Sequence, residues 1–325
     1  MENRNNVVTD ILHPCYEINH ISLKVTATPS AVCVLVYSFL AFLCLLTVCG
    51  NLIVIISISY FKQLHTPTNT LIMSLAVADL LVGVLVFPLS MSFSLSSCLY
   101  NNNMFCEIRD SLDVLLCTCS VLHLCCISVD RYYAVCQPLT YKSKINGRVV
   151  FIMIAVSWGV SVPVAIAVVQ PRSNNDECQE TCFIDIIIAN IVGLLFSFYL
   201  PVVIMLCIYI KIFAVAQRQA RSIQSTTKSG ATVSKMERKA TKTLAVVLGA
   251  FLFCWAPVFL YITFQSLENN VAPVYIIEVL AWLALSNSTL NPFIYCFFYS
   301  WFRSAFKMII SGKIFKENFV NLNLH

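Results

Sequence analysis

Seven stretches of the chain are each long and apolar enough to cross a lipid bilayer as a helix, which needs about 20 residues. They cover roughly residues 31–58, 66–95, 103–136, 147–169, 186–216, 237–266 and 272–298. The chain is 58% hydrophobic and only 11% charged, whereas soluble domains are about 25% charged. The sequence therefore predicts an all-α membrane protein folded as a seven-transmembrane helix bundle.

The distribution of charge predicts how the bundle lies in the membrane. Lysine and arginine gather in the loops after the first, third and fifth stretches and after the seventh, while the acids gather on the other side. Because basic loops stay in the cytoplasm, we expect a multi-pass plasma-membrane protein with an extracellular N-terminus and a cytoplasmic C-terminus. Residues 1–30 then form an extracellular tail, 31–298 the bundle, and 299–325 a cytoplasmic segment.

The segment after the seventh stretch has an amphipathic pattern. Its aromatic residues Trp301 and Phe302 alternate with the basic residues Arg303 and Lys307 at helical spacing. Such a pattern is typical of a helix that lies along a membrane surface. The sequence therefore predicts a short amphipathic helix on the inner leaflet; a packing helix buried in the protein is the alternative.

Two carboxylates stand at the outer end of the third stretch. An ionised acid such as Asp113 costs about 2.5–3.5 kcal/mol inside a membrane helix unless a positive group meets it. Asp113 precedes Arg131 by eighteen residues, or about 27 Å of helix, so it lies just inside the outer boundary. A protonated ligand could reach it there, although pairing with Arg109 is an alternative. Asp110 would hold a second ammonium or steer cations from solvent.

Other functional classes find less support in the sequence. His65 and His123 lack a partnered nucleophile or a metal-ligand spacing, so no catalytic residue is expected, and no nucleic-acid partner. No pair of broken helices repeats along the chain, which disfavours a transporter built from inverted repeats. A cation channel or transporter, with Asp79 and Asp113 on an ion path, stays an alternative.

Short motifs, one on each of six stretches, support a closer assignment. They are Gly50-Asn51, LAVADLL at 75–81, DRYYAVCQPLTY at 130–141, Trp158, FLFCWAP at 251–257 and NPFIY at 291–295. In this order they resemble the motifs of rhodopsin-like G-protein-coupled receptors. The run NSTLNPFIYCFFYSWFRSA at 287–305 further resembles the signature of trace amine-associated receptors, and of the fish-type olfactory members among them.

The resemblance implies a function and partners. It implies a receptor that small protonated amines activate from the extracellular side, and that signals through a heterotrimeric G protein of the stimulatory type and cyclic AMP. A serotonin- or histamine-like aminergic receptor is the alternative within the same class. The lipid bilayer is its environment, and no cofactor is expected beyond a sodium ion as an allosteric ligand.

The resemblance also assigns residues to a ligand pocket. Asp113 falls at the amine-binding position. The remaining pocket positions are Trp255, Phe259 and Trp282, with Gly193 and Ser197 on the fifth span. Asp110, one turn above Asp113, stays a possible second amine contact beside its cation-steering role. Leu285 stands where many members have a tyrosine, and Gly193 where diamine-sensing members have an acid. Both departures favour a monoamine.

Further positions follow from the same resemblance. The sodium pocket would comprise Asp79, Ser120, Asn287, Ser288 and Asn291. The activation switch would comprise Asp130, Arg131, Tyr209, Glu237, Phe251, Trp255, Pro257, Pro292 and Tyr295. The resemblance pairs Cys106 with Cys182 and Cys15 with Cys178, although sequence does not determine connectivity and Cys106 with Cys178 is the alternative.

Overall fold

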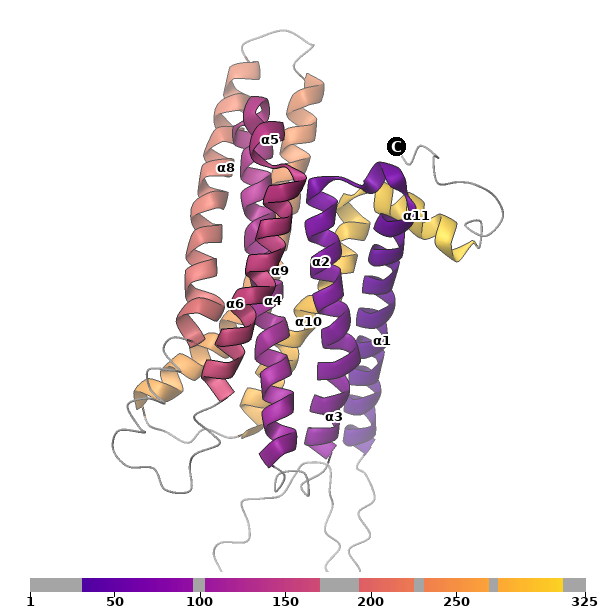
Figure 1. Ribbon diagram of the computed structural model, residues 1–325, viewed down its shortest axis with the longest axis vertical. Coiled ribbons are helices and arrows are strands. Elements are labelled where there is room, and N and C mark those ends of the chain that lie inside the picture. Colours follow the sequence, from indigo (N-terminus) through magenta and orange to yellow (C-terminus); the bar gives the residue numbers. More distant parts are fainter. Residues whose placement is uncertain (1–30, 96–102, 170–192, 225–230, 269–273, 312–325) are drawn as a thin grey trace, which may run out of the picture.

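The structure, a computed structural model, describes residues 31–95, 103–169, 193–224, 231–268 and 274–311. Within these ranges the chain forms helices and no strand. The long helices run side by side as one bundle (Figure 1). The predicted all-α membrane fold is therefore confirmed. The extracellular tail 1–30 and residues 312–325 lie outside the described ranges.

The described chain consists of long helices and several short helical elements. The long helices are α1 (Ala31–Tyr60), α2 (Pro67–Leu81), α4 (Asn103–Cys136), α6 (Gly147–Val169), α8 (Leu200–Gln224), α9 (Ala231–Glu268) and α10 (Val274–Phe298). The short elements include η1 (Lys62–Leu64), α3 (Phe87–Leu95) and α5 (Pro138–Lys144), and α11 (Ser300–Ile310) is the last helix of the described chain.

The described helices agree with the predicted spans. Six of them are long and apolar enough to cross a membrane by length and composition. The remaining helix, α10, packs between α1 and α9 and buries the polar residues Asn287, Ser288 and Asn291 inside the bundle. Helices α8 and α9 run past the predicted ends of their spans, to Gln224 and from Ala231, and project beyond their neighbours (Figure 1).

Two π-helical segments interrupt the regular helices, and the sequence analysis did not predict them. The segment η2 (Val82–Val86) comes before Pro88, and η6 (Leu195–Tyr199) comes before Pro201. Proline lacks the backbone N–H and crowds the carbonyl one turn earlier, so a wider turn relieves both problems. In η2 the carbonyl of Gly83 accepts a hydrogen bond from the Cys44 thiol at 3.2 Å.

Close contact between α1 and α10 explains one of the sequence motifs. A Cβ atom at Gly50 would lie 2.9 Å from the Cβ of Pro292, which is closer than two carbon atoms can pack. One turn earlier, the hydroxyls of Thr47 and Thr289 hydrogen-bond at 2.6 Å across the same interface. Small and hydroxyl residues therefore join these helices, as is common where lipid surrounds the bundle.

A buried polar chain joins α2, α4 and α6. The Trp158 indole donates to the Ser74 hydroxyl at 3.2 Å, and Ser74 hydrogen-bonds Nε2 of His123 at 2.8 Å. Nδ1 of His123 lies 2.8 Å from the carbonyl of Cys119. A carbonyl only accepts, so Nδ1 carries the proton and Nε2 accepts from Ser74. His123 is thus a packed residue with both ring nitrogens hydrogen-bonded inside the bundle.

The amphipathic segment forms α11, which runs across the end of the bundle (Figure 1). Trp301, Phe302 and Ala305 are buried, and α11 packs on α1 and α10. Arg303 donates to the carbonyls of Cys296 and Phe297 at 3.1 and 3.0 Å. This arginine satisfies carbonyls at the end of α10, which have no partner within the helix.

The α1–α10 contact predicts a specific sensitivity. Gly50→Ala should lower surface expression and shorten the half-life of the purified protein, because overpacking costs about 1–3 kcal/mol. Gly159→Ala is the matched control, since nothing lies within 4 Å of a Cβ at that position. Equal behaviour of the two variants in a surface-labelling and thermal-inactivation assay would contradict this account of the motif.

Candidate functional site

A cavity of about 410 Å³ lies among α4, η6, α9 and α10. Its acidic lining residue is Asp113, and the fifth-span wall includes Gly193 and Ser197. Most of the remaining lining is apolar, with Val114, Leu194, Val258 and Ile262 among the side chains. The cavity thus presents one carboxylate to a largely apolar space.

No ion pair within 4 Å reaches Asp113 among the described residues. Cys117, one turn along α4, donates its thiol proton to Oδ1 of Asp113 at 3.1 Å. Arg109 binds Asp110 instead, with 2.6 Å between Nη2 and Oδ1. The alternative in which Arg109 neutralises Asp113 is therefore not what the structure contains. Asp110 is half-buried in that pair and is not a lining residue of the cavity.

Three neutral polar groups also belong to the cavity. The hydroxyls of Thr118 and Ser197 hydrogen-bond at 3.2 Å across the α4–η6 wall. Nε1 of Trp255 is buried without a hydrogen-bond partner. The sequence analysis missed Cys117 and Thr118, although Cys117 lies four residues after Asp113 and positions at that spacing share a helix face.

The predicted pocket aromatics divide into two groups. Trp255 and Phe259 line the cavity, and Phe259 stacks on Phe198 with centroids 4.4 Å apart and planes at 7°. Trp282 is not a lining residue of this cavity; its ring packs edge-on against Phe87 at 5.5 Å. Phe198, which the sequence analysis did not single out, therefore supports the aromatic wall from η6.

The residues predicted for the sodium pocket come together around Asp79. This carboxylate is fully buried and accepts hydrogen bonds from Ser120 at 2.9 Å, Ser288 at 2.8 Å and Asn291 at 2.7 Å. Asn287 is also buried. Asn51 donates to the carbonyl of Ser288 at 3.1 Å and leaves its own Oδ1 buried without a partner. Three donors stabilise the buried acid.

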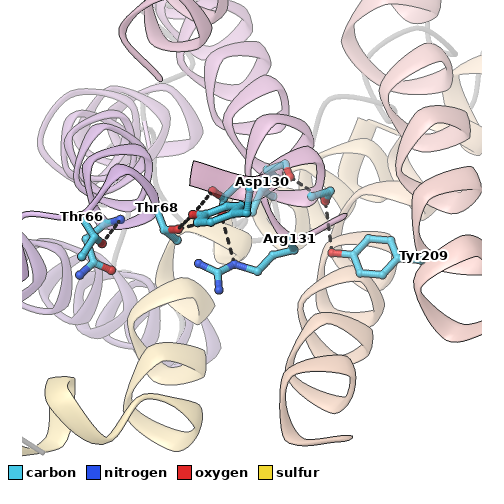
Figure 2. A network of polar contacts seen from close by, with 9 residues as sticks. Thr66, Thr68, Asp130, Arg131 and Tyr209 are labelled. Carbon is cyan, nitrogen blue, oxygen red and sulfur yellow. Dashed lines mark hydrogen bonds and ion pairs between the residues drawn. The ribbon is translucent and has the colours of Figure 1, made fainter. Parts of the chain in front are cut away.

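A second buried acid, Asp130, anchors a polar network near the end of α4 that lies away from Asp113 (Figure 2). Thr68 donates to Oδ2 at 2.8 Å and Tyr141 to Oδ1 at 2.9 Å. Nε of Arg131 lies 3.2 Å from Oδ2. Burial raises the pKa of Tyr141 above its usual value, so this phenol keeps the proton that it donates. Helix α5 is thereby tied to α2 and α4.

The structure describes most of the other residues predicted for the activation switch. The hydroxyls of Tyr209 and Ser128 hydrogen-bond at 3.2 Å between α8 and α4 (Figure 2). Pro257 lies inside α9 and Pro292 inside α10, while Phe251 and Tyr295 are buried. The side chains of Glu237 and of the four cysteines predicted to form disulfides, Cys15, Cys106, Cys178 and Cys182, lie outside the described part of the structure.

The fold and its buried sites define a class of protein. Residues 50–295 match the family described as 7 transmembrane receptor (rhodopsin family). The chain therefore belongs to the rhodopsin family of seven-transmembrane receptors, whose members are receptors and not enzymes.

More similar proteins narrow the assignment. The chain is 43% identical to trace amine-associated receptor 1 of Macaca mulatta, over 94% of this chain and 96% of that one. It is 42% identical to trace amine-associated receptor 9 of Mus musculus, over 95% and 94%, and 40% identical to receptor 4 of the same species, over 96% and 95%. Within the rhodopsin family, the chain thus belongs to the trace amine-associated receptors, and the resemblance seen in its motifs is confirmed.

The Asp130 network predicts a local effect. Tyr141→Phe removes one donor and should weaken the docking of α5 by about 1 kcal/mol, so backbone amides of residues 138–144 should exchange hydrogen roughly fivefold faster. Hydrogen–deuterium exchange with mass spectrometry measures this rate. Tyr132→Phe is the control, because its ring contact with Tyr133 does not need the hydroxyl. Unchanged exchange in Tyr141→Phe would mean that the phenol does not hold α5.

Proposed function

We propose that this protein is a G-protein-coupled receptor activated by small protonated amines, with Asp113 as the amine-binding residue. The observation that carries the proposal is a carboxylate in a largely apolar cavity, while the nearest cation on its helix, Arg109, binds Asp110. An ammonium would form a charge-assisted hydrogen bond with such a carboxylate. Relatives named for trace amines support the same class of ligand.

The cavity favours a monoamine. The described lining residues contribute no acid besides Asp113. The fifth-span wall offers Gly193 and Leu194, and α10 offers Ala281 and Leu285. A distal ammonium would lose its hydration there without a compensating charge. The rings of Trp255 and Phe259 would add cation–π attraction of about 0.5–2 kcal/mol. An amine on a compact apolar body fits these constraints best.

Activation would proceed through α9. Pro257, two residues after Trp255, removes one backbone hydrogen bond and allows the helix to bend. Outward movement of the cytosolic part of α9 would expose Arg131 to a heterotrimeric G protein. Coupling to the stimulatory type and cyclic AMP, an olfactory role, and a plasma-membrane orientation with the N-terminus outside extend the proposal on the strength of the motif resemblance and the positive-inside charge pattern.

The amine site predicts a large loss on substitution. Asp113→Ala should reduce amine potency a hundredfold or more, because an unpaired buried ammonium costs roughly 3–5 kcal/mol. The measurement is cyclic AMP accumulation in cells expressing the chain, with a panel of mono- and diamines that includes 2-phenylethylamine, histamine, serotonin and cadaverine. Surface expression is quantified in parallel, and Trp282→Phe serves as a control outside the cavity lining. Potency within threefold of the unsubstituted receptor would place the anchor elsewhere.

We further propose that the Asp79 cluster holds a sodium ion. The cluster supplies the oxygen ligands that hard cations prefer, from the carboxylate and from the hydroxyls of Ser120 and Ser288. The unpartnered Oδ1 of Asn51 adds a buried acceptor beside Ser288. A bound cation would neutralise an acid that the bilayer otherwise penalises.

The sodium proposal has a direct test. In membranes, replacing choline chloride with sodium chloride at constant ionic strength should lower agonist affinity, because sodium would stabilise the inactive arrangement. Asp79→Asn should abolish this dependence, since the amide retains hydrogen bonding but carries no charge. A sodium effect that persists in Asp79→Asn would mean that the ion acts at another site.

A further inference from the structure

Arg109, Asp110 and Asp113 lie within about one turn of α4, and the arginine forms its ion pair with only one of the two acids. Arg109 and Asp113 are four residues apart, the spacing at which oppositely charged side chains meet on a helix. Arg109 instead reaches its immediate neighbour Asp110, with Nε at 3.0 Å and Nη2 at 2.6 Å from the same Oδ1. Two donors on one carboxylate oxygen make this a strong local contact.

The alternative pairing would disable the proposed amine site. If the guanidinium turned one turn along the helix to Asp113, it would supply the positive charge that the amine is proposed to supply. An amine would then have to displace a tethered cation before it could bind. Arg109 is tethered to the same helix, so it would compete with the amine at every amine concentration. The apparent affinity would then be reduced in proportion to the fraction of receptors in which Asp113 is still available.

Asp113 has a contact of its own, on the side away from Arg109. The Cys117 thiol lies one turn further along α4 and donates to Oδ1 at 3.1 Å. Asp113 is therefore bound on the cavity side, while Arg109 is bound on the outer side. Both contacts are local to α4, so they persist in any rigid-body movement of the helix.

We propose that Asp110 is a positioning residue of the amine site: it engages Arg109, and thereby keeps this guanidinium from neutralising Asp113. The inference rests on the proposed function, in which Asp113 binds the amine. It gives Asp110 a different role from that of a second amine contact, because its charge acts on Arg109 and not on the ligand.

A double-substitution experiment separates these roles. Asp110→Asn should release Arg109 and lower the potency of 2-phenylethylamine, or of the most potent monoamine in the panel if that compound is silent, by about tenfold. Arg109→Gln alone should keep potency within about threefold, and the double variant should regain it, because no competing cation is left. Ser111→Ala, on the same turn, controls for general disturbance of the helix.

Each outcome of this experiment either supports or overturns the proposed role of Asp110. A loss in Asp110→Asn that Arg109→Gln does not reverse would show that Asp110 acts on the amine directly or through the surface potential, and would overturn the proposal. No loss in Asp110→Asn would overturn it as well, because Arg109 would then not compete for Asp113. Recovery in the double variant supports it, since a direct amine contact could not be restored by removing a cation.

A ligand-free arm makes the test independent of the proposed function. In the purified receptor without amine, Asp113→Asn should lower the unfolding temperature more in the Asp110→Asn background than in the unsubstituted chain, because only there would it break a new Arg109–Asp113 pair. Equal shifts in both backgrounds would overturn the proposal. If no amine activates the unsubstituted receptor, the proposed function fails, while this thermal cycle still decides how Arg109 is held.

Discussion

The cost of burying an acid in a bilayer without partners from the protein governs this structure. Water is absent from the hydrocarbon core, so each unpaired donor or charge costs several kcal/mol. Asp79 and Asp130 offset this cost with three close partners each. Asp113 has one thiol donor from its own helix. Among the described residues, Asp113 therefore has fewer internal partners than the other two acids.

Backbone irregularities give the cavity its walls. The π-helical segment η6 precedes Pro201 and includes Ser197, whose hydroxyl reaches Thr118 on α4. The same segment presents Phe198 to Phe259 at stacking distance. A regular helix would rotate these side chains by the equivalent of one residue, about 100°. The turn that accommodates a proline therefore also sets which side chains the cavity receives.

Sequence reasoning predicted the helices well, because bilayer thickness and hydrophobicity fix where a span can lie. It also brought Ser120, Ser288 and Asn291 to Asp79, through motif resemblance and not through any local pattern. It missed what depends on contacts between helices: the π-helical turns, the docking of α5 and the thiol of Cys117. It placed Trp282 in the pocket, whereas the ring packs on Phe87, because helix register alone does not determine which neighbour an aromatic ring meets.

Helices α4 and α9 connect the two ends of the bundle. The first contains both Asp113 and the Asp130–Arg131 pair, and the second contains Trp255 at the cavity and extends beyond the bundle at its other end (Figure 1). An amine that bound equally well to every arrangement of these helices would change none of their populations. Coupling requires that the cavity differ between arrangements. Trp255 is placed to meet that requirement, since it lines the cavity two residues before Pro257. A bend at Pro257 would therefore alter both the cavity wall and the far end of α9.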